Sequence, residues 1–249
     1  MDYSTFCRQL ELIGVNEHTL SAEEKIELDE RGYLLIPHVL LTEQIEECRS
    51  IFEASYTTLR EESHKETGTR HVSLGFQLPE IYQKFYGNPK LLAAASHILR
   101  RPFVAFGLHA RDPLFDNGQQ GLHADWGIMQ PNEPYHVVNS IWYLDDSSGI
   151  NGSTRVVPGT HRYRGQSLNG MKEFIAPHKH HPKEIIIEAK AGSVLIFNGH
   201  LFHSGTRNIT GKTRRVVICG FAAAEHRFLY QNAQPAKGRV PRTMEFLFG

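Results

Sequence analysis

The sequence lacks an excess of charge of either sign. Lys plus Arg and Asp plus Glu number 27 each among the 249 residues, so the formal net charge at pH 7 is zero. A balanced charge gives no electrostatic basis for binding nucleic acid or an anionic membrane surface. We therefore expect neither of them as a partner, while the oligomeric state stays open.

Cysteines and long apolar runs are also scarce. The three cysteines, Cys7, Cys48 and Cys219, are widely spaced and odd in number, which argues against a disulfide framework or a zinc motif. Cys219 lies in an apolar run, where we expect it to be packed. Residues 1–6 have no basic or long apolar stretch, and no run reaches the length of a membrane span. These absences predict a cytoplasmic protein.

The length suits a single domain with one sizeable core. We expect one domain over residues 1–249, with a mainly helical part over 1–101, a jelly-roll core over 102–222 and a C-terminal extension over 223–249. After residue 102 the sequence changes to short apolar segments separated by turn residues. Eight strands are predicted, over residues 103–111, 122–130, 136–144, 154–157, 185–188, 193–197, 201–204 and 213–221. This number of strands favours a mainly β, double-stranded β-helix (jelly roll, cupin-type) with flanking N-terminal helices.

The helical part has recognisable start and stop signals. Ser21 and Glu24 have the spacing of a capping box, and the helix that they begin should end at Gly32, which tolerates left-handed backbone geometry. The other predicted elements are a strand over 33–36, a helix from Thr42, a polar loop over 61–75 and a helix from Asn88-Pro89.

The motif that indicates chemistry is His123-Ala124-Asp125. On a β-strand, residues i and i+2 point to the same face, so His123 and Asp125 can bind one ion together. The short motif is common by chance, and an exposed His and Asp at a strand end is the alternative. A distant histidine completes a two-histidine, one-carboxylate triad that leaves positions open, as in non-haem Fe(II) oxygenases. His203 and His200 compete for that third place and, three residues apart on a strand, face opposite ways.

Further segments follow the motif in a set order. They are residues 141–146 (IWYLDD), 151–161 (NGSTRVVPGTH), 191–197 (AGSVLIF), 203–205 (HSG) and Arg214. In this order they resemble the phytanoyl-CoA dioxygenase family of Fe(II)/2-oxoglutarate oxygenases. The resemblance extends upstream to residues 32–37 (GYLLIP), so it covers roughly residues 25–222.

The resemblance implies the double-stranded β-helix fold and an enzyme that uses Fe(II), 2-oxoglutarate and O₂. It implies that His123, Asp125 and His203 are the metal ligands, and it favours His203 because Arg214 follows it by eleven residues. Arg214 would bind the far carboxylate of 2-oxoglutarate, for which the planar guanidinium provides a bidentate donor.

Two other cosubstrate contacts are implied with less weight. Thr154 matches a threonine that donates to 2-oxoglutarate in relatives. Gln120 is the weaker candidate, because some relatives place a glutamine two residues before the first ligand, where this chain has Gly121. Of the neighbouring arginines, Arg215 is expected to be solvated on the opposite face, and Arg207 is a less favoured substitute for Arg214.

Other polar residues have competing interpretations. The cluster His178-Lys179-His180-His181 lies between two prolines, so an exposed loop is favoured over a metal site there, and the loop could help to cover the active site. His161 is expected to be a structural partner. The residues considered for the substrate pocket, each of which also suits a surface or packing role, are Arg70, His109, Arg111, Gln119 and Trp126.

The expected activity is oxidation of a small organic metabolite, with decarboxylation of 2-oxoglutarate to succinate and CO₂. Hydroxylation is favoured because relatives that halogenate have Ala or Gly at the position of Asp125, and secondary metabolism is the expected setting. Two rivals remain: a non-catalytic cupin-like sensor that binds a metal or ligand, and a metal-dependent hydrolase on the same triad. Fold and triad alone do not select the substrate.

Overall fold

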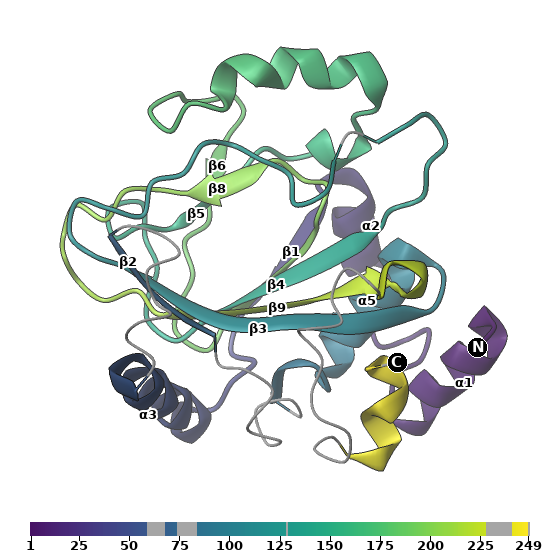
Figure 1. Cartoon of the computed structure of the whole chain (residues 1–249). Coiled ribbons are helices and arrows are strands. Elements are labelled where there is room, and N and C mark those ends of the chain that lie inside the picture. The colour runs from purple at the N-terminus through teal and green to yellow at the C-terminus, as the bar shows by residue number, and fades with distance from the viewer. Residues whose placement is uncertain (59–67, 74–83, 128, 228–240, 249) are drawn as a thin grey trace.

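The two sheets of the protein lie face to face (Figure 1). The computed structural model describes residues 1–58, 68–73, 84–127, 129–227 and 241–248. The strands are β1 (Tyr33–Ile36), β2 (Thr69–Ser73), β3 (Phe103–Pro113), β4 (Val137–Tyr143), β5 (Thr154–Val156), β6 (Ile185–Ile186), β7 (Val194–Asn198), β8 (His203–Gly205) and β9 (Val216–Ala223). The larger sheet has the order β1-β7-β4-β9-β3-β2 and the smaller one β6-β5-β8. This mainly β jelly roll agrees with the predicted fold.

The helices cover one side of the larger sheet. They are α1 (Tyr3–Leu12), α2 (Ala22–Glu30), α3 (Thr42–Thr58) and α5 (Pro89–Leu99), with 3₁₀ segments η3 (Thr160–Arg162), η4 (Gly165–Phe174) and η6 (Arg242–Leu247). Figure 1 shows α1, α3, α5 and η6 on the side of the larger sheet that faces away from the smaller one, and η4 beyond the smaller sheet. None of the described helices is long and apolar enough to cross a membrane.

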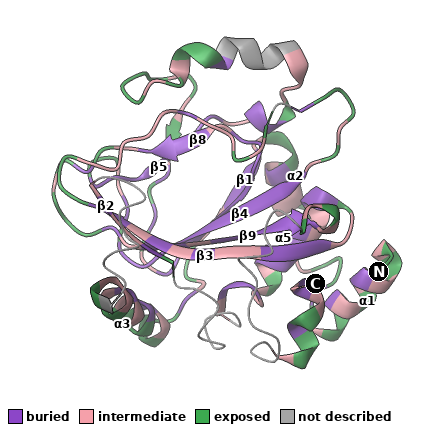
Figure 2. Ribbon diagram, in the orientation of Figure 1, coloured by how far each residue is buried: buried purple, intermediate pink, exposed green. Residues whose placement is uncertain are grey.

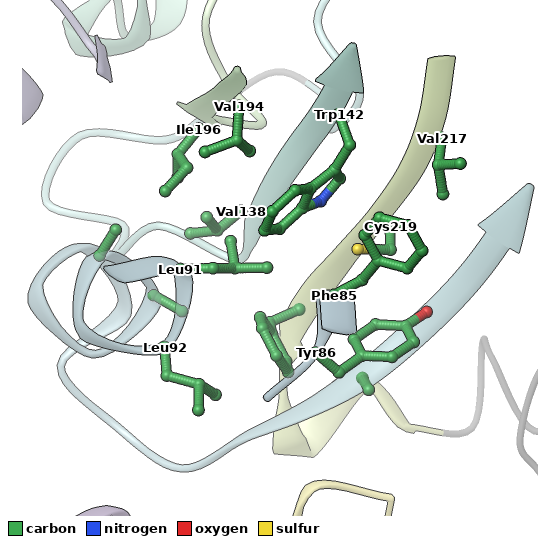
Figure 3. Packing of buried hydrophobic residues seen from close by; sticks show 14 of the residues in the cluster. Phe85, Tyr86, Leu91, Leu92, Val138, Trp142, Val194, Ile196, Val217 and Cys219 are labelled. Atoms are coloured by element: carbon green, nitrogen blue, oxygen red, sulfur yellow. The ribbon is translucent and has the colours of Figure 1, made fainter. Parts of the chain in front are cut away.

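The core lies between the larger sheet and these helices. Figure 3 shows Leu91 of α5 packed against the face of β4 that presents Val138 and Trp142. Phe85 meets the Trp142 ring edge-on, with 5.1 Å between ring centroids. Figure 2 shows the central strands of this sheet as largely buried. Cys219 is also buried in this cluster, as predicted, and burial raises the pKa of its thiol to about 12.

The predicted helix signals are confirmed at two N-termini and one C-terminus. Ser21 and Glu24 form the reciprocal capping box of α2, and Asn88 caps α5 through the backbone N–H of Leu91. Gly32 follows α2 with a φ of 84°. A Cβ atom at Gly32 would lie 2.4 Å from Nδ1 of His161, so the histidine packs directly against the backbone there. His161 thus has the structural role that was predicted.

Several predicted boundaries are wrong. The described residues of the range 122–130 form no strand: they contain a single isolated bridge, between His123 and His203. Thr69–Ser73, predicted as part of a loop, pair with β3 as strand β2, while residues 61–67 and 74–75 lie outside the described residues. The strand predicted over 213–221 begins only at Val216. Helix α1 was not predicted, and η6 places Met244 and Leu247 of the expected C-terminal extension in the core.

Candidate metal centre

Three side chains from two distant parts of the sequence converge between the two sheets. The nearest ligand atoms of His123, Asp125 and His203 all lie within 4.8 Å of one another. Asp125 is central: its Oδ1 is 3.8 Å from Nε2 of His123, and its Oδ2 is 3.5 Å from Nε2 of His203. The structure therefore brings together the three residues that the sequence predicted as ligands.

Backbone hydrogen bonds hold this group, although the described residues between 122 and 130 form no strand. His123 and His203 exchange both backbone N–H···O bonds, at 3.0 and 2.9 Å. The backbone N–H of Asp125 donates to the carbonyl of Gly199 at 2.8 Å. The side chains of His123 and Asp125 thus point the same way because the bridge to His203 and the contact with Gly199 hold their backbone. They do not belong to a continuous strand.

Both histidine rings have a fixed orientation. Nδ1 of His123 lies 2.9 Å from the carbonyl of Gly121, and Nδ1 of His203 lies 2.9 Å from the carbonyl of Leu201. A carbonyl only accepts, so each Nδ1–H donates and each Nε2 keeps its lone pair toward the centre. Burial lowers the pKa of His203, although the nearby Asp125 partly opposes this. The neutral ring is the form that binds a metal.

A neighbouring amide orients the carboxylate. Nδ2 of Asn139, on β4, donates to Oδ2 of Asp125 at 2.5 Å. Sequence reasoning missed Asn139, yet a signal was present: it is a polar residue in the middle of a strand, with the apolar Val138 before it and the apolar Ile141 two residues after it. Polar residues inside a buried strand require a partner, and here the partner is a proposed ligand.

The donor set fits iron. Two imidazole nitrogens and one carboxylate oxygen are the ligands of the facial triad that leaves positions open for other molecules. His200, the competing histidine, is turned elsewhere: its Nε2 accepts the backbone N–H of His136 at 2.9 Å. Burial also lowers the pKa of His200 to about 3. It therefore packs as a neutral ring, and His203 is the histidine at the centre.

A cavity of about 350 Å³ opens from the triad between the sheets. The predicted residues that line it with the triad are Arg214, Thr154, Gln120, His109 and Arg111. Arg214 is only 5% exposed, and its backbone N–H donates to Oδ1 of the buried Asp112 at 2.8 Å. The cavity thus combines the three proposed metal ligands with a buried guanidinium and a strand threonine.

Gln120 reaches the cavity although it lies three residues before His123. Its Oε1 accepts the backbone N–H of Gly205 at 3.1 Å. The next position is Gly121 for a steric reason: a Cβ atom there would lie 1.6 Å from the carbonyl oxygen of Ile175. A glutamine therefore does not fit at position 121, which accounts for this departure from the family pattern.

Arg70 and Gln119 take the alternative role that was left open for them, and the expectation for Arg215 is wrong. Arg70 is not in the cavity: it forms ion pairs of 2.6 Å with Glu53 and with Asp112, the carboxylate that holds the backbone of Arg214. Gln119 donates instead to the carbonyl of Pro177. Arg215 is not solvated, because its guanidinium pairs with Asp145 at 2.8 Å and with Glu53 at 3.0 Å. Each faces a partner that is distant in the sequence.

The remaining alternatives lie away from the cavity. Arg207 forms an ion pair with Asp116 at the surface, at 2.6 Å. Residues 178–180 are exposed and His181 is partly so, in agreement with a surface loop. Trp126 is not part of the cavity lining and borders a neighbouring apolar space, and its ring stacks on His136 with 4.6 Å between centroids.

A second group of potential ligands consists of His136, Glu225 and His226. Arg101 lies inside this group: its guanidinium is 3.0 Å from Nδ1 of His136 and 3.0 Å from Glu225. A permanently charged guanidinium repels a metal cation and already uses the same acceptor atoms. The group is therefore a hydrogen-bonded ion cluster, and the triad is the better metal site among the described residues.

The comparisons with known proteins agree with this geometry. A sequence profile of the family described as phytanoyl-CoA dioxygenase (PhyH) matches residues 28–216. Dioxygenase af480 of Aspergillus fumigatus is 25% identical over 226 residues, covering 85% of this chain and 70% of its own length. The Fe(II)/2-oxoglutarate-dependent dioxygenase nvfF of Aspergillus novofumigatus is 32% identical over 101 residues, covering 39% of this chain and 30% of its own. HygX of Streptomyces hygroscopicus, solved with nickel and 2-oxoglutarate, shares the fold at a TM-score of 0.61 and 20% identity, covering 82% and 88% of the two chains.

Proposed function

The chain belongs to the phytanoyl-CoA dioxygenase (PhyH) family and is an Fe(II)- and 2-oxoglutarate-dependent dioxygenase, and from this premise we propose that it hydroxylates a small organic metabolite at the cavity between its sheets. In this proposal His123, Asp125 and His203 hold the iron. Arg214 and Thr154 bind 2-oxoglutarate, with Gln120 at the edge of the same cavity.

One observation carries the proposal: the ligand group and a buried arginine line one cavity. A hydrolase or a simple metal sensor needs the three ligands but has no need of Arg214. A 2-oxo acid needs both, because one end meets the metal and the far carboxylate needs a charged donor. The shared cavity therefore supports a dioxygenase over these two rivals.

The residues of the chain have separate roles in this reaction. With iron and 2-oxoglutarate bound, O₂ would be the oxidant: one of its oxygen atoms would enter succinate as CO₂ is lost, and the other would become the new hydroxyl group of the product. Arg214 orients the cosubstrate through its far carboxylate. Asn139 holds the carboxylate of Asp125, and the carbonyls of Gly121 and Leu201 hold the two histidine rings.

Hydroxylation is the outcome that the ligand set favours. Asp125 supplies a carboxylate where relatives that halogenate have Ala or Gly. Its Oδ2 already accepts from Asn139, so the carboxylate is held in place rather than free to leave the centre. The relatives named dioxygenase include fungal proteins such as af480, which supports a setting in secondary metabolism.

An anaerobic titration tests the proposal. Metal-free protein receives Fe(II) and 2-oxoglutarate while the visible metal-to-ligand charge-transfer band is recorded. We expect the band with the wild type and none with His123→Ala. Arg207→Ala serves as the matched control, because Arg207 is an arginine at the surface that pairs with Asp116, and its band should be normal.

The same protein distinguishes the rivals. A dioxygenase releases succinate only with O₂ and 2-oxoglutarate present. A hydrolase on the same triad would act without either, and a sensor would bind metal without releasing succinate. A folded, metal-binding protein that gives no band and no succinate would contradict the proposal.

A further inference from the structure

A second space adjoins the metal cavity on the side of His123. It has a volume of about 300 Å³, and His123 lines both spaces. Its other principal walls are Leu122, Trp126, Met129, Met171, Ile175 and Phe202. We call it the apolar chamber. The metal cavity, by contrast, has Arg214 and Asp125 in its walls.

The walls of the apolar chamber are a built part of the core. Leu122 and Met171 belong to a separate buried cluster, with exposures of 0% and 2%, and Phe202 packs against that cluster. The ring of Trp126 stacks on the ring of His136. Packed hydrocarbon and aromatic side chains therefore form the walls of the chamber.

The 3₁₀ segment η4 and the residues after it form one wall. Figure 1 shows this segment beyond the smaller sheet, on the side away from α3 and α5. The backbone N–H of Gly165, the first residue of η4, donates to the carbonyl of Met129 at 2.9 Å. At the other end, the carbonyl of Ile175 lies so close to Gly121 that no side chain fits between them. Contacts at both ends thus connect η4 to the loop that carries His123 and Asp125.

We propose that the apolar chamber is the substrate subsite and takes an uncharged hydrocarbon portion of the substrate, a ring system or a chain. The proposal rests on the proposed function. The charged cosubstrate occupies the polar cavity with Arg214, and the substrate enters beside His123, so that the carbon to be oxidised lies next to the metal. Burial of apolar surface then supplies most of the affinity.

The same walls disfavour other substrate classes. A phosphate, carboxylate or ammonium group placed among Leu122, Met171 and Phe202 would lose its hydration without gaining a charged partner. Lys172 also lines the space, but it is exposed and so can only meet a group at the rim. The chamber therefore favours a substrate whose reacting half is hydrocarbon over nucleotides, amino acids and phosphonates.

Binding of two small probes to the whole chain tests the chamber directly. The first is 2-tetralol, a neutral and mainly hydrocarbon bicyclic alcohol, and the second is myo-inositol, a ring that is polar on all sides. Calorimetry gives the Kd of each, and fluorescence reports on the chamber, because the chain has only two tryptophans and the other, Trp142, is buried in the core. We expect 2-tetralol to bind and change the fluorescence, and myo-inositol to do neither.

Matched variants locate the bound probe. Met171→Trp fills the chamber and should weaken 2-tetralol binding roughly tenfold or more, whereas the volume-conserving Met171→Leu should leave it within about threefold. Ala93→Leu fills a different groove, beside α1 and α5, which Leu10 and Val15 also line. The Ala93→Leu variant should bind 2-tetralol with the affinity of the wild type.

The contrary results are distinct. Loss of binding in Ala93→Leu but not in Met171→Trp, equal binding of myo-inositol, or no binding of 2-tetralol each overturns the chamber proposal. Should Met171→Trp not fold, Ile175→Lys replaces it, because Ile175 lies at the rim and is 53% exposed. That variant should also weaken binding, and unchanged affinity overturns the proposal.

The charge-transfer band separates this inference from the proposed function. With Fe(II) and 2-oxoglutarate bound, 2-tetralol in the chamber lies beside His123 and should shift the band. The chamber proposal alone is refuted if the band is normal, 2-tetralol does not shift it, and the binding of 2-tetralol does not depend on Met171. No band in any condition, with Met171-dependent binding of 2-tetralol retained, would refute the dioxygenase site and leave the chamber as a binding site.

Discussion

The two sheets of this jelly roll differ in what their residues do. The larger sheet has six strands, and most of the residues of its central strands β4, β7 and β9 are buried. The smaller sheet has three strands of two or three residues each. Yet the smaller sheet supplies His203 and Thr154, and His203 forms the isolated bridge with His123. Packing is concentrated in the larger sheet, and the smaller sheet supplies part of the proposed site together with larger-sheet residues such as Asn139.

This difference indicates how the fold can keep its core while its site varies. The face of β4 with Trp142 packs against the helices, whereas the opposite face presents Asn139 and Ile141 to the cavity. One strand therefore connects the two layers, because successive side chains point to opposite faces. Changes on the helix side should alter stability, and changes on the cavity side should alter ligand binding.

The largest effect is expected on the cavity side. Asp125→Ala removes the one carboxylate of the triad, so we expect 2-oxoglutarate-dependent succinate release to fall below detection while the melting temperature stays close to that of the wild type. The assay is done without chloride or other added anions, because a small anion can occupy the space that the carboxylate leaves. Normal turnover under these conditions would show that Asp125 is not a ligand.

The complementary change lies in the larger sheet. Trp142→Ala leaves a cavity where Phe85 and Ser140 now contact the indole, and we expect a loss of about 3–5 kcal/mol in the free energy of unfolding. Denaturant unfolding measures the loss, with Trp142→Phe as the milder control. The affinity of the folded protein for 2-oxoglutarate should be unchanged, and a large change in it would break the division between the two layers.

The same division explains what could be predicted from the sequence. The strands of the larger sheet are long enough for apolar patterns to predict β3, β4 and β7 closely. The loop of His123 and the strand β6 are short, and distant groups fix their geometry, such as Gly199 for Asp125. Local patterns do not contain those partners. The triad was predictable because the motif order implied it, not because the local backbone was predicted correctly.

Charged residues show the limit of local patterns most clearly. Arg214 and Arg215 are neighbours, and the sequence indicated that Arg214 binds the cosubstrate and that Arg215 is solvated. Arg215 instead pairs with Asp145 and Glu53, which come from separate elements. Arg70 has the same explanation, since its partner Asp112 is 42 residues away. Ion pairs between distant elements leave no local signal.

The third prediction concerns cosubstrate affinity. Arg214→Ala removes a buried guanidinium from the cavity, and we expect the Kd for 2-oxoglutarate to rise roughly 10- to 100-fold, the range of a charge-assisted hydrogen bond. The charge-transfer band at saturating 2-oxoglutarate should remain, because the triad is intact. Arg215→Ala is the matched control on the adjacent residue, and equal weakening by both would contradict the assignment.

The fourth prediction concerns the strand that joins the layers. Asn139→Ala removes the donor to Oδ2 of Asp125, and we expect the Kd for Fe(II) to rise by about tenfold, as for other partners of metal ligands. Metal competition with a fluorescent chelator measures it. Ser140→Ala, on the other face of the same strand, should leave the affinity for Fe(II) unchanged, and an equal effect would mean that β4 acts through general packing.

The smallest effect concerns pH and lies outside the cavity, where Arg215 connects the start of β9 to α3. Burial favours a higher pKa for Asp145, but hydrogen bonds from the side chain and backbone of Arg215 outweigh it, so the pKa is lowered. A lowered carboxyl pKa adds stability above the unfolded value of about 3.9, and this stability is lost as the pH falls through the folded value.

Arg215→Gln should therefore be less stable than the wild type at pH 7 by about 1 kcal/mol, and the difference should shrink below pH 4. Chemical denaturation at both pH values measures it. A difference that stays constant with pH would mean that Arg215 stabilises the protein by packing alone, and the larger layer would then depend on its hydrocarbon core without help from its ion pairs.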